Sequence, residues 1–409
     1  IMRKLPVIAT NDYLPVEAEL RDYMQSVILD SYKSYGFQRI STPILEDIEN
    51  LDKSDGGENL NLIFKILKRG AKLSSALSTG EPLTDMGLRY DLTLPLSRFY
   101  ANNKQNLLLP FKCIQIDKVY RAERPQKGRL RELVQCDIDI IGSRSIHSEI
   151  ELIHATAKAL LRLGLRNFTV VVNDRRILNE LLLKCGFQDE ELPTVCVTFD
   201  KADKIGTKGV IEELLSKNLP ANSIEQLSQL LSSFPISLEK VQKYCPDSPA
   251  IYELQEIIRI SSQLSNSEYT VAFDLSLVRG QGYYTGPVFE IKSRDFNTSI
   301  AGGGRYDGLI GKFTGEDIPA VGFSIGFERI YCILSESNYQ IPNSKKRIAI
   351  IHTSDTFINA TCLAEQYRSQ YDVSLFEKPK KLGKFLFSLK NNGYYGTIDL
   401  TISTELKLF

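Results

Sequence analysis

The segment Tyr120–Glu132 reads Tyr-Arg-Ala-Glu-Arg-Pro-Gln-Lys-Gly-Arg-Leu-Arg-Glu and decides the fold that we expect for this chain. It lies between Phe111–Val119 and Val134–Gly142, two stretches in which apolar and polar residues alternate. This pattern predicts two strands joined by a long polar loop. The five basic and two acidic side chains of the segment leave two interpretations. The loop is either a solvated turn or an anion clamp, in which arginines bind phosphate oxygens through paired hydrogen bonds and Glu123 orients them.

The composition is that of a multi-domain protein with sizeable cores. The chain has 409 residues, of which 43% are hydrophobic, and its 50 basic and 50 acidic side chains cancel. Because no overall field would steer a polyanion, a nucleic-acid partner must be met by local basic patches. No apolar run approaches the roughly eighteen residues of a transmembrane helix, and no signal-peptide pattern follows the first residues. We therefore expect no membrane association.

Cysteines and histidines offer no clear site. The seven cysteines are odd in number, scattered, and without Cys-x-x-Cys spacing. This favours reduced thiols in a cytosol-like compartment over a disulfide framework or a zinc site, and predicts a cytoplasmic protein. The three histidines, His147, His154 and His352, have no catalytic-triad context, so we expect each to be structural.

Helical and extended patterns alternate through the first part of the chain. The expected elements are helices over 16–35, 94–100, 148–163 and 176–185, strands over 37–46, 62–67, from 87 and over 168–172, and an exposed loop over 69–82. Pro43 cannot donate to a strand ladder, so its strand suits a sheet edge or an interface.

The second part indicates the domain organisation. Short helical segments with Ser, Asn and Pro punctuation predict a helical insertion over 192–264 within a main domain of two parts, 1–191 and 265–337. Strands are expected over 269–274, 283–291, 299–301 and 321–325, with a helix over 325–336. A polar linker over 338–346 then precedes alternating strands and helices over 347–409. We predict an α+β fold, an antiparallel sheet flanked by helices, with a small C-terminal α/β domain.

A lone arginine marks a second candidate segment. The stretch Asp274–Gly286 places Arg279 among apolar residues, glycines and the paired Tyr283 and Tyr284. An unpaired guanidinium is costly in such surroundings. Arg279 is therefore expected either in a structural ion pair or against a substrate phosphate or carboxylate, whose charge it would neutralise.

Glycines mark the last two candidate segments. Gly302, Gly303 and Gly304 end a strand and offer a floor without side chains, against which a small ligand can lie. The run matches neither the dinucleotide-binding nor the P-loop pattern, so by itself it does not indicate a nucleotide. The segment Gly322–Arg329 runs from a strand into a helix, and its Arg329 is either a surface residue or a functional one.

Taken together, these segments resemble the class II aminoacyl-tRNA synthetases, and within that class the histidyl-tRNA synthetase family. The similarity covers almost the whole chain. The matching segments are Arg121–Arg129 for the motif 2 loop, Leu277–Gly280 with Tyr283 and Tyr284 for the histidine-binding signature, Gly302–Asp307 for the second signature, and Gly322–Arg329 for motif 3. The first helix and the strand around Pro43 resemble motif 1, which in the class forms the dimer interface.

The resemblance implies an enzyme that activates L-histidine with ATP and transfers the histidyl group from histidyl-adenylate to the 3′ end of histidine tRNA. It implies a homodimer and a C-terminal anticodon-binding-like domain. Arg121 would bridge the histidine carboxylate and the α-phosphate, and Arg279 would stabilise the α-phosphate from the opposite side. Glu123 would meet the adenine, and Arg329 would bind the bent ATP. Mg²⁺ is expected with the β- and γ-phosphates, without an assigned protein ligand.

For the amino acid, the resemblance assigns the ammonium group to Asp91 and Thr93. Gln135 and Asp139 lie four apart on a strand and so face one side, where they would accept the imidazole N–H. The other residues implied in the histidine pocket are Arg121, Arg279, Tyr283, Tyr284, Gly302, Gly303 and Gly304.

Two departures from the family pattern and two alternatives remain. Gln281-Gly282 stands where the family commonly has Leu-Asp, and the C-terminal segment from Arg347 to Phe409 is shorter than is usual for an anticodon-binding module. A synthetase-like regulatory subunit of histidine biosynthesis would lack the full motif 2 loop and the C-terminal domain, and both are present. An RNA-sensing module without catalysis would be expected to lose the catalytic arginines, whereas Arg121, Arg279 and Arg329 are all present.

Overall fold

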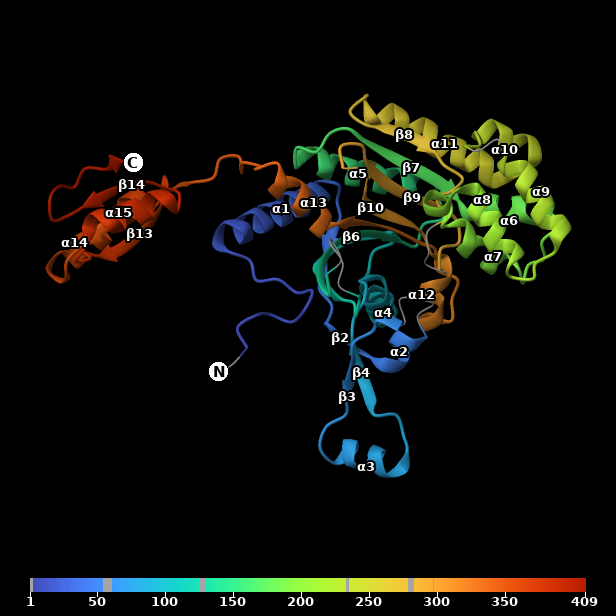
Figure 1. The fold of residues 1–409 in the computed structure, drawn as a ribbon, viewed down its shortest axis with the longest axis horizontal. Coiled ribbons are helices and arrows are strands. Elements are labelled where there is room, and N and C mark those ends of the chain that lie inside the picture. Colours follow the sequence, from blue (N-terminus) through green and yellow to red (C-terminus); the bar gives the residue numbers. More distant parts are fainter. Residues whose placement is uncertain (1–2, 54–60, 125–129, 233–234, 279–282, 297) are drawn as a thin grey trace. The chain divides into compact units, whose positions relative to one another are not determined.

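The computed structural model describes residues 3–53, 61–124, 130–232, 235–278, 283–296 and 298–409 (Figure 1). The chain forms two compact units, Ile1–Asn338 and Tyr339–Phe409. Each unit has its own sheet and its own apolar core.

An eight-stranded sheet organises the first unit. Its spatial order is β1 (Gln38–Arg39), β5 (Phe111–Tyr120), β6 (Glu132–Ile141), β11 (Ala320–Gly326), β10 (Thr298–Arg305), β9 (Pro287–Ser293), β7 (Phe168–Asp174) and β8 (Thr270–Phe273). The six strands from β5 to β7 pair antiparallel, while β1 and β8 add parallel edges. The predicted antiparallel sheet flanked by helices is therefore confirmed.

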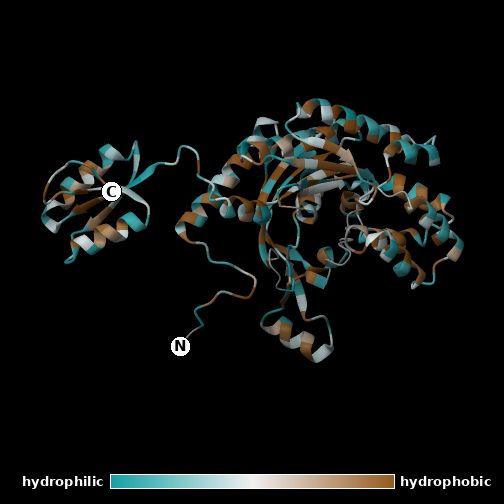
Figure 2. Ribbon diagram, turned by 45° about the horizontal axis from the view of Figure 1, so that its top comes forward, coloured by the Kyte–Doolittle hydropathy of each residue, from teal (hydrophilic) through white to brown (hydrophobic). Residues whose placement is uncertain are grey.

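Helices cover one face of this sheet. They are α1 (Pro15–Ser34), α5 (His147–Arg162), α11 (Pro249–Ser265) and α13 (Phe327–Glu336). Helix α5 contacts α1, α11 and the strands β6 and β11, and α13 packs on β6 and β10. The buried residues of these helices are mostly apolar, and hydrophobic and hydrophilic residues alternate along the helices of the first unit (Figure 2).

The opposite face of the sheet is only partly covered by apolar side chains. Helices α4 (Thr93–Asn103) and α12 (Asp307–Thr314) pack against each other on this side. Their apolar residues join those of the strand ends in one cluster, which includes Leu96, Phe111, Leu309 and Ala320. Strand β6 continues beyond this cluster with polar residues facing the same side, and this uncovered part of the sheet holds the site described below.

The structure corrects two predictions for the early part of the chain. The strand expected over 37–46 is two strands in different sheets, because β1 joins the large sheet while β2 (Leu45–Asp47) pairs with β4 (Thr84–Leu88), which also pairs with β3 (Lys65–Leu67). Helix α2 (Ile48–Asp52) follows β2 directly.

The segment 69–82, expected to be an exposed loop, contains helix α3 (Ala71–Thr79) between Gly70 and Gly80. Gly80 ends the helix in the left-handed conformation that glycine adopts without strain. Ala76 is the buried residue of this helix, so its sequence lacks the apolar stripe by which amphipathic helices are recognised.

The described residues of 192–265 form five helices after α6 (Arg175–Lys184). They are α7 (Leu192–Phe199), α8 (Ala202–Leu215), α9 (Ala221–Leu231), α10 (Leu238–Tyr244) and α11. Helix α11 differs from the others because it packs on α5, β7 and β8 and so belongs to the layer that covers the large sheet.

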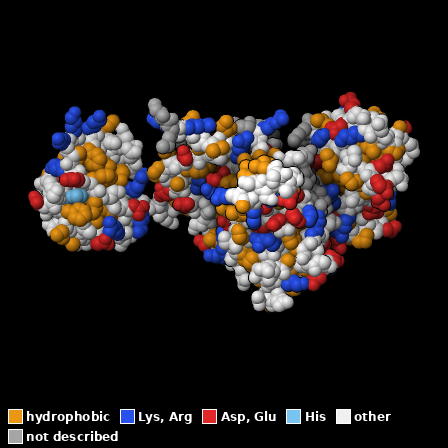
Figure 3. All heavy atoms as spheres, turned by 90° about the horizontal axis from the view of Figure 1, so that it is seen from below, with side chains coloured by type: hydrophobic (Ala, Val, Ile, Leu, Met, Phe, Trp, Pro, Cys, Tyr) orange, Lys and Arg blue, Asp and Glu red, His pale blue; other side chains and the backbone are white. Residues whose placement is uncertain are grey.

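The second unit is a small α/β fold. Its sheet has the order β13 (Tyr371–Glu377), β12 (Lys346–His352), β14 (Tyr394–Asp399) and β15 (Lys407–Leu408), with two parallel pairings and one antiparallel pairing. Helices α14 (Phe357–Tyr367) and α15 (Leu382–Asn391) pack on its strands. Single 3-10 turns occur at Ser354–Thr356 and, in the first unit, at Lys104–Asn106. On the face of this unit that is visible in Figure 3, hydrophobic side chains gather in a patch.

None of the helices in the described part of the chain combines the length and the hydrophobicity that crossing a bilayer requires.

Candidate active site

The strands β6, β10 and β11 form the floor of a cavity of about 920 Å³. It collects residues from segments that are far apart in the sequence. The predicted site residues that line it are Asp91, Thr93, Arg121, Glu123, Gln135, Asp139, Tyr283, Tyr284, Gly302, Gly303, Gly304 and Arg329. Arg279, with Gln281 and Gly282, lies outside the described residues, so its expected position opposite Arg121 stays a prediction.

Strand β6 supplies a row of polar side chains to the cavity. Gln135, Asp137 and Asp139 all line it, because alternate residues of a strand face the same side. The two carboxyl groups are deeply buried, at 5% and 4% exposure. Asp137 was not among the residues predicted from the sequence, although the same alternation that pairs Gln135 with Asp139 includes it.

The glycines of the floor make room for these side chains. Gly322 faces Asp139 across the β6–β11 ladder, and a Cβ atom at Gly322 would lie 2.0 Å from the Oδ1 of Asp139. A Cβ atom at Gly303 would lie 2.0 Å from the carbonyl oxygen of Gly322, and one at Gly304 would lie 2.8 Å from the ring of Tyr284. Glycine is therefore required at these positions by space rather than by backbone conformation.

Tyrosines close the inner end of the cavity. The hydroxyl of Tyr306 donates a hydrogen bond of 2.6 Å to the Oδ1 of Asp139. The rings of Tyr283 and Tyr284 are 4.8 Å apart, and Tyr306 packs edge-on against Tyr283. Burial raises the pKa of Asp139 to about 7, although the Tyr306 hydrogen bond opposes the increase. The sequence did not single out Tyr306, because its partner Asp139 is 167 residues away along the chain.

A third buried acid, Asp91, lies just before α4. Asp91 is 3% exposed, and its Oδ1 accepts a hydrogen bond of 3.2 Å from the backbone N–H of Leu94. Burial raises the pKa of Asp91 to about 6, and this backbone bond and the nearby Arg121 lower it only in part. Thr93, the first residue of α4, lines the cavity beside it. A buried carboxylate and a hydroxyl form a suitable pocket for an ammonium group.

Arg121 is held in place by the wall of the cavity. Its Nε donates to the carbonyl oxygen of Tyr90 at 2.9 Å, and its Nη2 lies 3.5 Å from the Oε1 of Gln135. Arg124 and Glu123 line the cavity from the same segment. The guanidinium is thus positioned by protein groups on one edge, as a preorganised anion-binding group requires.

The strand-to-helix segment at β11 and α13 is fastened to the first helix. Arg21 of α1 donates to both oxygens of Glu328, at 2.6 and 2.8 Å, and Glu328 also accepts from the backbone N–H of Val134 at 3.1 Å. Arg21 lies over the ring of Tyr13, 4.0 Å from its centroid. The neighbouring Arg329 lines the cavity and donates to the carbonyl oxygen of Ser299. Sequence patterns gave no sign of the Arg21–Glu328 pair, since its residues are 307 positions apart.

Arg305, which follows the glycine run, serves the fold instead. It donates to the two oxygens of Glu149 on α5, at 2.6 and 2.9 Å, and to Asp307 at 3.2 Å. Glu149 is fully buried, so this pair fixes α5 beneath the glycine strand.

Histidines and cysteines do not occur among the described residues that line the cavity. His154 lies 3.4 Å from the hydroxyl of Tyr269, and His352 packs against Phe357, in agreement with structural roles. Five cysteines are buried, while Cys332 and Cys362 are exposed.

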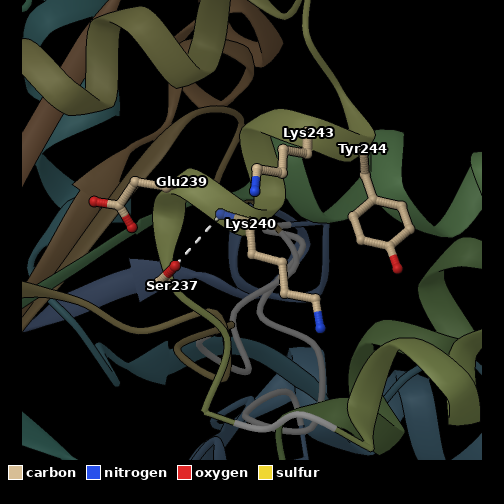
Figure 4. Close-up of a pocket in the computed structure, with 5 residues that line it drawn as sticks. All are labelled: Ser237, Glu239, Lys240, Lys243 and Tyr244. Atoms are coloured by element: carbon tan, nitrogen blue, oxygen red, sulfur yellow. Dashed lines mark hydrogen bonds between the residues drawn. The ribbon is translucent and has the colours of Figure 1, made fainter.

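A second, shallower hollow lies on helix α10 and the residue before it. It is lined by Ser237, Glu239, Lys240, Lys243 and Tyr244, and Ser237 caps the helix by accepting from the backbone N–H of Lys240 (Figure 4). Its side chains come from one short helix and spread outward, so we assign it no function.

Comparisons with known proteins agree with the geometry. A family model described as histidyl-tRNA synthetase matches residues 9–330. The chain is 42% identical to a histidine–tRNA ligase of Leifsonia xyli over 83% of this chain and 82% of the relative, and 37% identical to one of Azobacteroides pseudotrichonymphae over 88% and 81%.

Solved structures support the fold. A histidyl-tRNA synthetase from Nostoc superposes with a TM-score of 0.79 at 24% identity, covering 97% of this chain and 91% of that one. A Bacillus halodurans protein described as an ATP phosphoribosyltransferase regulatory subunit/histidyl-tRNA synthetase gives 0.79 at 23% identity, covering 98% of each chain. At these identities the two structures bear on the fold alone.

Proposed function

Because this chain belongs to the histidyl-tRNA synthetase family, we propose that it is a histidine–tRNA ligase and that the cavity over β6, β10 and β11 is its active site. The observation that carries the assignment is the single cavity itself. It brings buried carboxyl groups, suited to a cationic amino acid, next to guanidinium groups suited to phosphate.

In the first step, a carboxylate oxygen of histidine attacks the α-phosphorus of ATP. A P–O bond to the amino acid forms, the bond to the β-phosphate oxygen breaks, and pyrophosphate leaves with the electron pair. Arg121 binds the histidine carboxylate and an α-phosphate oxygen together, which aligns the attack and neutralises charge that grows at phosphorus. Its hydrogen bonds to Tyr90 and Gln135 hold it in place before substrate arrives. Arg279 acts on the opposite side of the same phosphate.

Histidine lies along the β6 side of the cavity. Its ammonium group binds Asp91 and Thr93, while Gln135 and Asp139 orient the ring. Tyr283 and Tyr284 close around it over the Gly302–Gly304 floor. An amino acid without ring N–H donors would lose its hydrogen bonds to the polar groups of Gln135 and Asp139, which gives stronger discrimination than apolar fit can.

ATP occupies the outer part of the cavity. Glu123 binds the adenine, and Arg329 contacts the bent triphosphate. Within the described residues, no three acidic, histidine or cysteine side chains come together as a metal cage. Mg²⁺ in nucleotide sites is commonly held by phosphates, waters and one or two carboxylates, so the chain does not need such a cage. The ion, when bound, offsets charge on the β- and γ-phosphates.

In the second step, a terminal ribose hydroxyl of histidine tRNA attacks the carbonyl carbon of the adenylate. An ester forms and AMP leaves. The unit Tyr339–Phe409 is the proposed anticodon contact, and its exposed Lys380, Lys381, Lys384 and Phe387 suit a phosphate backbone with unstacked bases. We place the dimer interface at α1 and the edge strand β1, and the protein in the cytosol.

The test is histidine-dependent exchange of labelled pyrophosphate into ATP, followed by charging of histidine tRNA. We expect pyrophosphate exchange with histidine and with none of the other amino acids. Histidine tRNA should be charged at a rate comparable to that of the exchange. Histidine binding without exchange would instead identify a regulatory subunit or an RNA sensor.

A further inference from the structure

One polar group in the cavity has no part in the mechanism above, the carboxyl of Asp137. The side chain is 5% exposed and lines the cavity. Its Oδ2 lies 3.5 Å from the Nε2 of Gln135, but its Oδ1 has no hydrogen-bond partner in the described part of the chain. A buried oxygen without a donor is costly, so the site is complete only when a ligand supplies one.

The residues that face Asp137 from the flanking strands are already engaged. Gln115 on β5 faces it across the ladder, and both polar ends of the Gln115 amide bond to other groups. Ser324 faces it on β11, hydrogen-bonds the same carboxyl and also accepts from Gln135 at 3.1 Å. Neither strand therefore provides the missing donor for Oδ1.

The inner end of the cavity is rich in acids. Going along β6 from Gln135, which contacts Arg121, each step of two residues moves about 7 Å further in. Asp137 and then Asp139 follow, with Asp91 close enough to raise the pKa of both. Burial and Asp139 raise the pKa of Asp137 well above its usual range, and Arg121 lowers it only in part.

Three other charged groups that line the cavity are one further acid and two basic side chains that contact partners of their own. Glu290 on β9 adds another acid. Lys292 lies 3.4 Å from the carboxylate of Asp274, and Arg329 donates to the carbonyl oxygen of Ser299. Tyr283 and Tyr306 are neutral, because burial raises the pKa of both hydroxyls well above the usual value.

We propose that Asp137 is a histidine-binding residue and that, together with Asp139, it holds the ring of the substrate as an imidazolium cation. The proposal rests on the proposed function, because it takes histidine as the occupant. A neutral imidazole has one N–H donor and one lone pair, whereas the imidazolium has two donors. Two adjacent buried carboxylates accept both N–H groups of the cation, whereas a neutral ring requires one of the two acids to keep its proton and donate it to the ring lone pair.

The proton for the ring is available within the site. In the empty cavity the two neighbouring acids share protons near neutral pH, because burial raises the pKa of Asp139 to about 7 and that of Asp137 well above the usual value. When histidine enters, one carboxyl O–H breaks and a ring N–H forms, leaving a carboxylate against the cation. No other reactant is required.

The direct test is nitrogen NMR of ring-¹⁵N-labelled histidine bound to the full-length protein at about pH 8, roughly 1.5 units above the usual imidazole pKa. We expect both ring nitrogens of the bound histidine at protonated chemical shifts, while free histidine is neutral. One protonated and one unprotonated nitrogen in the bound ring would overturn the proposal.

Kinetics of the Asp137→Asn variant test the contact separately. The amide keeps the shape but removes the charge, so the KM for histidine should rise about tenfold or more while the KM for ATP changes less than about twofold. The preference for histidine over 2-fluorohistidine, an analogue whose ring stays neutral at this pH, should shrink by a similar factor. An unchanged histidine KM and an unchanged preference would contradict the proposal.

Asp189→Asn is the matched control, because Asp189 is exposed after α6 and has no part in the cavity. If Asp137→Asn fails to fold, the NMR measurement on the unaltered protein still decides. Exchange activity with a neutral bound ring would refute this inference alone, whereas a protein that neither binds nor activates histidine would refute the proposed function with it.

Discussion

At the scale of single residues, the site depends on charges that are buried and held before substrate arrives. Arg121 is positioned by Tyr90 and Gln135, and Asp139 by Tyr306. Fixed groups of this kind stabilise a charged transition state without reorganising during the reaction.

Replacing Arg121 tests this directly. Lysine keeps the positive charge but has no planar fork, so in Arg121→Lys it cannot hold Tyr90 and Gln135 while binding two anionic groups. We expect the kcat for histidine-dependent exchange to fall at least about 100-fold, with the midpoint of thermal unfolding changed by less than about 2 °C. Arg144→Lys, at an exposed ion pair with Asp317, is the control and should keep full activity. Exchange within about tenfold of the original in Arg121→Lys would show that Arg121 has another role.

Asp139 makes the stability of the ligand-free protein depend on pH. Its pKa is about 7 in the fold against a usual 3.8, so the folded state binds the proton more tightly. This contribution to stability is fully present below about pH 4 and is lost as the pH rises through 7, by up to about 4 kcal/mol at 1.4 per pKa unit.

We therefore expect Asp139→Asn to gain stability relative to the original protein between about pH 4 and pH 8, by urea unfolding without ligand. A stability difference that stays constant across this range would contradict the assigned burial of the carboxyl. The variant should also lose histidine binding, which separates its role in the site from its effect on the fold.

Sequence alone could identify part of this residue set. The resemblance to the family assigned roles to Arg121, Gln135 and Asp139, and strand alternation showed that Gln135 and Asp139 face one side. Asp137 shares that alternation but was not singled out, and Tyr306 could not be paired with Asp139 because the two are 167 residues apart. Such contacts depend on strand register, which local patterns do not determine.

At the scale of elements, the glycine strands set the depth of the cavity. Gly322→Ala would place a methyl group 2.0 Å from the Oδ1 of Asp139, where little can move because the carboxyl is fixed by Tyr306. We expect a loss of about 1–3 kcal/mol in unfolding free energy and a marked rise in the KM for histidine.

Gly308→Ala is the matched control for that substitution. Gly308 lies in α12 with open space where its Cβ atom would be, so alanine there should leave the KM unchanged and stabilise the protein slightly. If both variants bind histidine like the original, the floor is not part of the histidine site.

Helices and strands whose apolar residues recur at regular spacing were predictable from the sequence. Elements that depend on contacts with distant parts of the chain were not. The long helix α1 and the strands β5 and β6 have clear apolar patterns. Helix α3 was missed because it buries one residue and shows no stripe, and the strand around Pro43 split because its halves pair with different sheets. The pair Arg21–Glu328, which ties α1 to α13, has no local signature at all.

At the scale of the whole molecule, we expect the two compact units to serve different steps of the reaction. The described residues that line the cavity all belong to the first unit. We therefore expect adenylate formation not to require Tyr339–Phe409. A chain ending at Asn338 should keep exchange activity within a few-fold. Charging of histidine tRNA should fall at least about 100-fold, because the proposed anticodon contact is removed. Equal loss of both activities would show that the second unit supports the active site itself.

The proposed function requires above all that the cavity over β6 binds histidine and the α-phosphate together. A crystal structure with a non-hydrolysable analogue of histidyl-adenylate tests it most directly. We predict the imidazole ring beside Asp137 and Asp139, and the group that replaces the phosphate within about 3 Å of both Arg121 and Arg279. An analogue bound elsewhere, or one whose linking group contacts neither guanidinium, would contradict the account.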